Sequence, residues 1–434
     1  MPADKLTPRA LNRATLARQL LLHPSNLTPA QAITHLAGLQ AQAPLAPYVG
    51  LWTRLAAFRP DHLEDLLNER GVLRAHLMRN TVHLVDTADY LRFRPLFQPP
   101  MDRALAGNWG RRLAGVDLAE LREVAAVLLA ETPLTRVALA RALAPRWPGH
   151  DPAALAHAAS HLLPLVQVPP RGLWRQSGPA AFMLASAWLN SRPSSPSPTP
   201  SAPLTPLTPF ATLIPPTPSA TLIPLAVSAP PTAPIPLALS TAPVPLAPVE
   251  YSTVVEELVL RYLAAYGPAS VADIQAWSGL TRLREVTERL GGRLRPLAGP
   301  DGAVLLDLAH VPEDGAPAIP DPDTPAPPRF LPEYDNLLLS YAERSRVIPH
   351  SRPVPLPPGN GASVGTLLID GCWQADWRIR KDSVRDEGAV LEVHPFVPLS
   401  AADRDAVAAE GQRLLGFVRP ADTARDVRFA RDGE

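Results

Sequence analysis

Few residue types in this 434-residue chain have the spacing that enzyme chemistry usually needs. The sequence contains no phosphate-loop Gly-Lys-Ser/Thr, no His-Glu-x-x-His and no cysteine pair, and its eleven histidines are scattered without ligand spacing. Gly359-Asn360-Gly361 lies in a proline-rich loop and not between a strand and a helix, so it is not a dinucleotide fingerprint. The two lysines, Lys5 in a predicted tail and Lys381 after a strand, argue against Schiff-base chemistry. The sequence therefore predicts no metal site and no cofactor.

Two glutamines separated by a single residue, Gln40 and Gln42, could act together through their side-chain amides. On a helix, residues i and i+2 point about 200° apart, so the pair would diverge and would serve only to cap a helix end. In an extended chain the two side chains can converge, and Pro44 disfavours helix at Ala43. The residues alone leave both interpretations open.

The elements around this pair follow an order that recurs along the chain, in which helices precede a β-hairpin. The clearest copy has helices over 254–266, 271–277 and 281–290 and a hairpin of 294–297 with 303–308. A second copy has helices over 118–130, 133–143 and 152–163 and a hairpin of 165–168 with 173–176. A looser third has helices over 7–22, 29–39, 46–58 and 61–68 and a hairpin of 72–77 with 81–85. This is the winged-helix order, and three copies argue against coincidence.

The remaining segments differ from these copies. Residues 193–249 contain no Asp, Glu, Lys or Arg and have a proline every few positions, which predicts a polyproline-like linker or a partner-binding insert. The C-terminal segment predicts two strands joined at Asp370-Gly371, a third strand over 389–394 and a closing helix over 401–415. We therefore expect an α+β protein with winged-helix units at 1–90, 91–190 and 251–311, a proline-rich linker at 191–250 and a β-rich unit at 329–434.

Composition limits the protein's surroundings and partners. The formal net charge is zero, so binding to nucleic acid would depend on local basic patches. A single cysteine, Cys372, fits a reducing cytoplasm, and the N-terminus lacks the pattern of a signal peptide. We find no proline-free apolar run long enough to cross a membrane. The sequence thus predicts a cytoplasmic protein with no membrane partner, and we expect a monomer.

Several segments, in a specific order, resemble the AlkZ/YcaQ-type winged-helix DNA glycosylases, also called crosslink-repair DNA glycosylases. They are Gly38–Pro44, Leu51–Leu55, Leu77–Val85, Tyr266–Ser270 with Trp277–Leu280, and Leu331–Leu339. The resemblance spans nearly the whole chain except 193–249. It implies three tandem winged helices that cradle DNA, together with a β-rich C-terminal part.

The family's catalytic signature is glutamine, an apolar residue, then glutamine or aspartate. The resemblance therefore implies that Gln40 and Gln42 are catalytic and belong to the two-glutamine branch, which resembles enzymes that open azinomycin-type crosslinks. Alkylation at guanine N7 places a positive charge on the base, so the glycosidic bond is already weak. What remains is to place water at C1′ and to tolerate an oxocarbenium-like sugar. A glutamine carbonyl can orient that water, whereas an aspartate would add charge stabilisation and base catalysis.

Residues near the predicted hairpins are candidates for contacts with double-stranded DNA. Arg79 and Asn80 occupy the first hairpin turn, where they would meet phosphates or remain a solvated turn. His83 would contact DNA or the active site, or would be a core histidine of a strand. Arg171 and Trp174 flank the second hairpin in a similar way.

We expect monofunctional hydrolysis of the N-glycosidic bond of N7-alkylated purines in double-stranded DNA, including purines within interstrand crosslinks. The main alternative is a non-enzymatic winged-helix transcriptional regulator, which would bind a specific sequence and release no base. A third interpretation is an interaction scaffold that uses the proline-rich segment.

Overall fold

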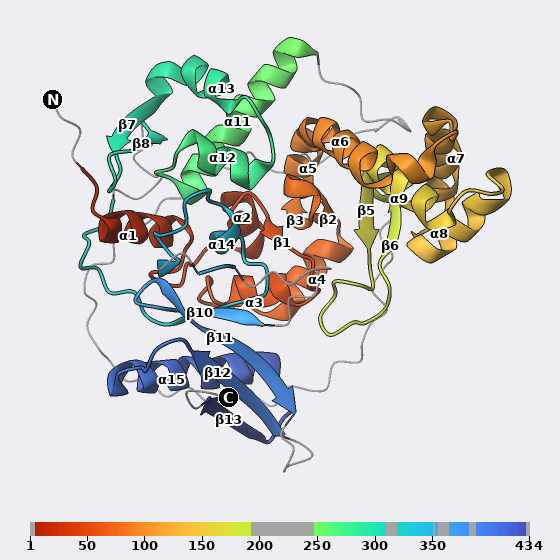
Figure 1. Cartoon of the computed structure of the whole chain (residues 1–434). Helices are drawn as coiled ribbons and strands as arrows, with labels where there is room; N and C mark the ends of the chain where they lie inside the picture. The colour runs from red at the N-terminus through yellow and green to blue at the C-terminus, as the bar shows by residue number, and fades with distance from the viewer. Residues whose placement is uncertain are drawn as a thin grey trace.

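The computed structural model describes residues 5–191, 247–309, 319–349, 352–354, 364–381 and 388–430. This part contains both helices and strands, and the strands form sheets of six, five and two strands (Figure 1). This confirms the α+β class. The predictions for 193–249 and for Gly359-Asn360-Gly361 fall outside the described residues, apart from the start of a helix at Pro248.

The N-terminal elements surround the two glutamines. They are α1 (Pro8–Arg18), α2 (Pro29–His35), β1 (Leu39–Gln40), α3 (Ala46–Trp52), α4 (Pro60–Asn68), β2 (Val72–His76), a 3-10 turn η1 (Met78–Asn80) and β3 (Val82–Asp86). Thr28 begins α2 through a capping box with Gln31, in which side chains and backbone amides satisfy one another. Strands β2 and β3 pair as the predicted antiparallel hairpin.

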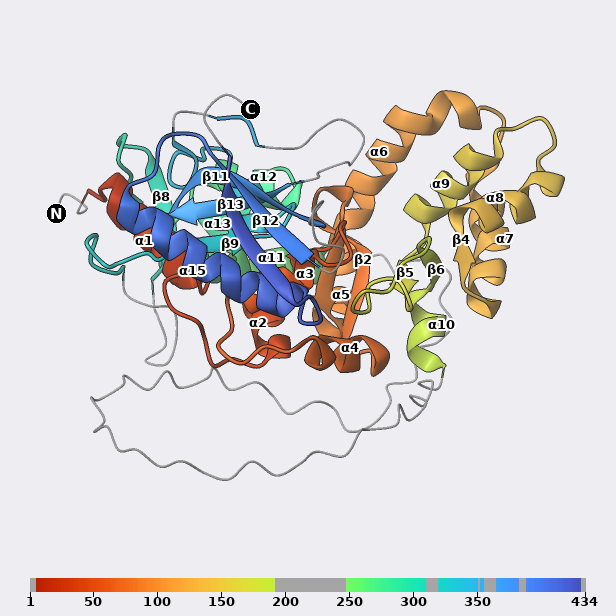
Figure 2. The same cartoon turned by 90° about the horizontal axis from the view of Figure 1, so that it is seen from below.

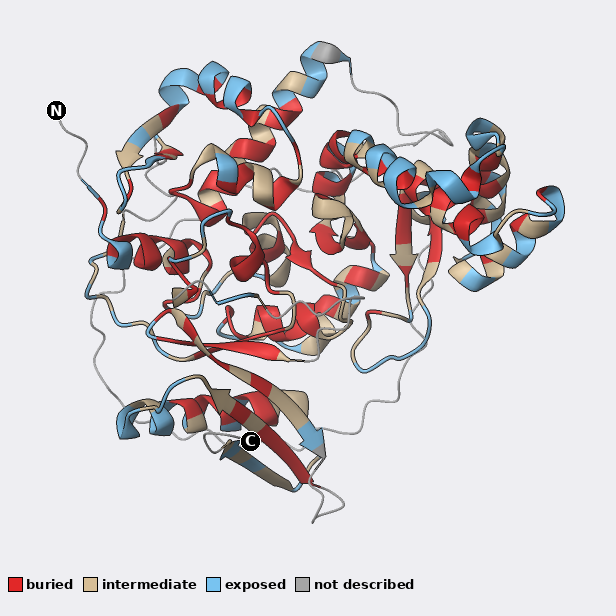
Figure 3. Cartoon of the chain, in the orientation of Figure 1, coloured by how far each residue is buried: buried red, intermediate tan, exposed pale blue. Residues whose placement is uncertain are grey.

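The next elements begin beside β2 and lead through α6 to a largely helical group at one end of the molecule (Figure 2). They are α5 (Thr87–Phe93), η2 (Arg94–Phe97), α6 (Gln98–Trp109), η3 (Gly110–Leu113), α7 (Leu118–Glu131), β4 (Leu134–Thr135), α8 (Arg136–Leu143), η4 (Ala144–Arg146), α9 (Pro152–Leu162), β5 (Leu165–Val168), β6 (Ala181–Leu184) and α10 (Ala185–Asn190). The inner face of α7 is buried and its outer face is exposed, whereas α9 is buried or half-buried beyond its first two residues (Figure 3).

The last elements comprise another helical group and the C-terminal sheet. They are α11 (Pro248–Tyr266), α12 (Val271–Ser278), α13 (Leu283–Leu290), η5 (Gly291–Arg293), β7 (Leu294–Ala298), β8 (Val304–Leu308), β9 (Arg329–Leu331), α14 (Asn336–Leu339), β10 (Gly365–Ile369), β11 (Cys372–Lys381), β12 (Gly388–Pro395), α15 (Ala401–Val418) and β13 (Ala424–Phe429). The five-stranded sheet has the order β13-β12-β11-β10-β9, and only β12 and β13 are parallel.

One arrangement recurs three times: a helix, a short strand, two helices and a hairpin, in which the short strand pairs with the last strand of the hairpin. It covers α2 to β3, α7 to β6 and α11 to β8, called here the first, second and third units. The short strand is β1 paired with β3, β4 paired with β6, and in the third unit a single bridge between Ala269 and Leu306. The first unit therefore begins with α2. The helix predicted over residues 7–22 corresponds to α1, which precedes this unit and packs on α11.

The first two units share one sheet, with the order β1-β3-β2-β5-β6-β4. Strand β2 pairs with β5 across the junction, where Arg74 lies opposite Gln167 and Ala75 opposite Val166. A continuous hydrophobic core runs from this sheet into α11, α12 and α14. Strand β1 is held by its pairing with β3, and its Leu39 packs in a separate hydrophobic cluster with α2, α3 and α4.

The predicted strand over residues 173–176 is wrong. Strand β5 instead pairs with β6, Ala181–Leu184. Gly172 and Arg175 both have positive φ, of 100° and 57°, which breaks any extended run between them. Trp174 turns toward the first unit, where it packs on Tyr48 with 4.9 Å between ring centroids.

Candidate active site

Gln40 and Gln42 lie at the end of the two-residue strand β1. Gln40 is paired in register with His83 of β3, and the Ala41 amide donates to the Val82 carbonyl at 2.7 Å. The chain is extended here, so the two side chains converge, and Gln40 Nε2 donates to Gln42 Oε1. Gln40 is 6% exposed, whereas Gln42 is half-buried. Of the two arrangements left open by the sequence, the structure shows the convergent one.

Arg79 contacts this pair from the turn between β2 and β3. Its backbone is left-handed, with φ of 55°, and its guanidinium points inward. One nitrogen, Nη2, donates to Gln40 Oε1 at 2.8 Å and to Asn336 Oδ1 at 3.3 Å, and Nη1 donates to the Trp277 carbonyl at 2.5 Å. Burial lowers the pKa of the Arg79 guanidinium to about 10, which leaves it charged at neutral pH.

A second arginine, Arg74, holds the backbone between the two glutamines. Its Nη2 donates to the Ala41 carbonyl at 2.8 Å and to Gln167 Oε1 at 3.3 Å. Arg74 is 2% exposed, and burial lowers its pKa to about 10. Within the described residues, no carboxylate forms an ion pair with Arg74 or Arg79. Dipoles of neutral amides and carbonyls, rather than counter-charges, therefore surround both cations.

Two of the residues predicted to contact DNA, the buried His83 and the half-buried Asn80, bond within the protein. His83 is fully buried and its Nδ1 lies 3.0 Å from the Thr81 carbonyl, so it occupies the core-strand position that the sequence left open. Burial lowers the pKa of His83 to about 3, which keeps it neutral. Asn80 Nδ2 lies 3.0 Å from His161 Nε2 in α9. The hairpin tip thus joins the second unit through Asn80 and the third through Arg79, and is not a free wing.

Arg171 and Trp174 lie in the loop between β5 and β6, and neither forms a hydrogen bond with Gln40 or Gln42 among the described residues. Arg171 is half-buried, and its Nη1 donates to the Gly178 carbonyl at 2.6 Å. Trp174 packs against Tyr48 and Phe417 in an aromatic cluster. The Trp174 ring is therefore already engaged by protein.

Sequence reasoning missed Arg74. An arginine inside the apolar run Val72–Ala75 was a usable signal, because a buried charge in a strand needs hydrogen-bond partners. The links from Arg79 to Trp277 and Asn336 join positions about two hundred residues apart or more, and no local pattern predicts them.

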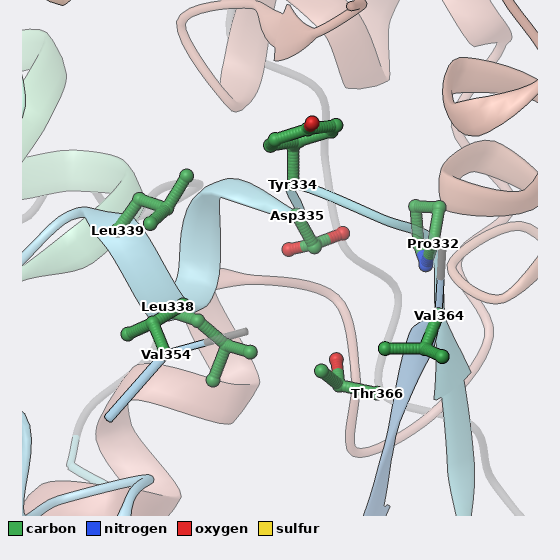
Figure 4. A pocket seen from close by; sticks show the side chains of 8 residues that line it. All are labelled: Pro332, Tyr334, Asp335, Leu338, Leu339, Val354, Val364 and Thr366. Atoms are coloured by element: carbon green, nitrogen blue, oxygen red, sulfur yellow. The ribbon is translucent and has the colours of Figure 1, made fainter. Parts of the chain in front are cut away.

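A small pocket lies beside α14, lined by Pro332, Tyr334, Asp335, Leu338, Leu339, Val354, Val364 and Thr366 (Figure 4). The Asp335 carboxylate is paired with Arg54 through two bonds of 2.9 Å, and both side chains are buried. Asp335 also caps α14 by accepting from the Leu337 amide at 3.0 Å. Its oxygens are thus already occupied, which indicates a structural role.

Other kinds of site find no support in the described part of the chain. It contains no group of three or more His, Cys, Asp or Glu side chains that could hold a metal ion. None of its helices is both long and apolar enough to cross a membrane.

Comparison with known proteins identifies the family. Residues 33–417 match the family model described as DNA glycosylase AlkZ-like. Among solved structures, the chain is similar to the Streptomyces sahachiroi DNA glycosylase AlkZ, with 17% sequence identity and a TM-score of 0.63 over 98% of this chain and 100% of that one. At this identity the likeness shows a shared fold. No curated protein matches the sequence. Since the family model covers most of the chain, this protein belongs to the AlkZ-like DNA glycosylase family and is a DNA-binding repair enzyme.

Proposed function

We propose that this glycosylase hydrolyses the N-glycosidic bond of N7-alkylated purines in double-stranded DNA, including purines joined in interstrand crosslinks. The observation that carries the proposal is the convergence of the Gln40 and Gln42 amides at the end of β1. Each amide oxygen has two lone pairs, so Gln42 Oε1 can accept from a water molecule while it accepts from Gln40.

In the proposed reaction, the bond between C1′ and N9 breaks and its electron pair neutralises the cationic purine. Water held by Gln42 Oε1 adds to the oxocarbenium-like C1′, and its proton passes to solvent. Neutral amides supply orientation and a partial negative charge but no strong base. Such a site therefore suits a base that leaves without being protonated, which favours N7-alkylated purines.

Monofunctional action is part of the proposal. A lyase would need an amine beside C1′, and the chain has only two lysines. Lys5 bridges to Ala298, and Lys381 is paired in register with Ala389 in the C-terminal sheet, so neither backbone lies next to β1. The reaction should end at the abasic site, without strand cleavage.

The repeated units support a cradle for DNA. We infer that the first, second and third units are winged helices, because in each the short strand pairs with the last strand of the hairpin. We also propose that the enzyme acts as a monomer, since all residues assigned to the reaction come from one chain.

The test uses a duplex that carries one 7-methylguanine and a second duplex with a nitrogen-mustard crosslink. The wild type should produce abasic sites without strand breaks, and the Gln40→Ala/Gln42→Ala variant should not. Gln412→Ala, an exposed glutamine on α15, controls for glutamine removal in general. Base release that survives the double change would reject the catalytic assignment. Sequence-specific binding without base release from either duplex would favour a transcriptional regulator.

A further inference from the structure

Arg79 links the catalytic pair to two distant parts of the chain. Its guanidinium donates to Gln40 in the first unit, to the Trp277 carbonyl in the third, and to Asn336 in α14. We propose that Arg79 is a positioning residue, which sets the direction of the Gln40 amide and through it that of Gln42. This inference rests on the proposed function of the two glutamines.

The direction of the amides follows from the chemistry of the guanidinium. Arginine carries only donors, so the end of the Gln40 amide that faces Arg79 must be its oxygen. The nitrogen of Gln40 then faces Gln42, which must present its own oxygen in return. A single cation thus decides which atom of each glutamine is available to water. Without the Arg79 guanidinium, each glutamine amide could also adopt the orientation in which its oxygen and nitrogen are exchanged, because the terminal amide torsion is nearly two-fold.

Two neutral groups, the Trp277 carbonyl and the Asn336 side chain, hold the Arg79 guanidinium in place without neutralising its charge. Trp277 lies in the last turn of α12, whose terminal carbonyls lack helical partners, and a cation there also interacts favourably with the helix dipole. Asn336, 3% exposed, accepts from Arg79 and donates to the Gly38 carbonyl just before β1 at 3.2 Å. A carboxylate in either place would neutralise Arg79 and could itself act as a base.

The local backbone turns the side chain inward. Arg79 and Asn80 both have positive φ, of 55° and 54°, which a tight turn between β2 and β3 requires. Gly279, itself at φ of 75°, ends α12 against this turn, and a Cβ there would lie 3.4 Å from the Arg79 amide nitrogen. The end of α12 therefore closes over Arg79, and the residue is better placed to hold Gln40 than to reach a phosphate.

The experiment measures single-turnover release of 7-methylguanine from a duplex at saturating enzyme, together with the Kd for that duplex. Arg79→Met should lower the rate constant about ten- to a hundred-fold, the range of a charge-assisted hydrogen bond, with little change in Kd. Added guanidinium chloride at low concentration should restore part of the rate. Arg79→Lys, which keeps the charge and its donors on one nitrogen but lacks the second nitrogen of the guanidinium, should lose less. Arg103→Met, which removes an exposed arginine from α6, should retain the wild-type rate.

Combination with Gln40→Ala separates positioning from general destabilisation. If Arg79 acts through Gln40, Arg79→Met should cause no further loss in that background. An equal further loss there, or a loss explained by weaker DNA binding, would overturn the inference, as would an unchanged rate in Arg79→Met or a loss in Arg79→Lys as large as that in Arg79→Met. Absence of base release by the wild type would overturn the proposed function and this inference together. Wild-type release that depends on Gln40 but not on Arg79 would overturn the inference alone.

Discussion

The change Gln42→Glu tests whether the second glutamine faces the reacting sugar. Glutamate matches glutamine in length, so Gln40 Nε2 can still donate to the side chain at position 42. The variant differs only in placing a full negative charge, and a titratable group, where a neutral amide stood. It should therefore stabilise the oxocarbenium-like transition state and introduce a pH dependence that the wild type lacks.

The size of the effect follows from the half-buried position of Gln42. Opposite unit charges about 5 Å apart interact by roughly 3 kcal/mol at an effective dielectric constant of about 20. This corresponds to about a hundredfold in rate as an upper limit, and the nearby Arg79 cation reduces it. We expect a gain of roughly ten-fold for 7-methylguanine, present above pH 5 and lost as the carboxylate is protonated near its ordinary pKa of about 4.3.

The assay is single-turnover base release between pH 4 and 9. The wild type should give a flat profile above pH 5, because amides do not titrate and burial lowers the pKa of His83 to about 3. Gln167→Glu is the matched control, since it adds the same charge beside Arg74 but not at the pair. A wild-type rate constant that rises or falls with pH near pH 7 would show that another, titratable group acts as the base. A Gln42→Glu rate as low as that of Gln42→Ala would refute the placement of Gln42 beside C1′.

Three further predictions concern residues that the structure assigns to stability. Because burial lowers the folded-state pKa of His83 to about 3, below the unfolded value of about 6.5, the unfolded state binds more protons on acidification. His83 should therefore contribute a fall of about 1.6 kcal/mol in the unfolding free energy between pH 6.5 and 5, and His83→Phe should remove this contribution in urea melts whereas the exposed His23→Gln should not. Asp335→Asn should lower the unfolding free energy by about 3–5 kcal/mol, because it leaves the Arg54 cation buried without its partner; a loss below 1 kcal/mol would contradict this interpretation. Trp174→Ala should reduce stability by about 3 kcal/mol in the same melts and leave DNA affinity nearly unchanged, since the ring packs within the protein; a selective loss of affinity would restore the DNA-binding assignment.

Much of the fold could be predicted from the sequence because helix caps and turn residues mark the same element boundaries that the folded structure has. The capping box at Ser270 and Asp273, and Gly279 after the helix, mark α12 without knowledge of the rest of the molecule. The C-terminal hairpin followed in the same way from Asp370-Gly371, both of which have positive φ.

The errors arose where tertiary contacts override local pattern. Residues 173–176 have the composition of a strand, but the left-handed Arg175 and the packing of Trp174 on Tyr48 turn the chain away from β5. The pairing of β2 with β5 joins two units that look separate in sequence, and periodicity does not encode which edges meet.

The candidate site was predictable in part. Pro44 and the spacing of Gln40 and Gln42 allowed convergence to be anticipated as one of two arrangements. Arg79 was predicted to contact DNA or to remain solvated at the hairpin turn. Its hydrogen-bond partners in the structure, Trp277 and Asn336, come from segments that only the folded chain brings together.

The most direct measurement of the central claim compares two abasic-site mimics in otherwise identical duplexes, one a neutral tetrahydrofuran and the other a cationic azasugar with its charge at the position of C1′. The wild type should bind the azasugar duplex at least about ten-fold more tightly, since it mimics the transition state that Gln42 Oε1, oriented through Gln40, stabilises. The Gln40→Ala/Gln42→Ala variant should bind both duplexes equally. A preference for the azasugar that persists in the variant would contradict the assignment of these two glutamines to the reacting sugar.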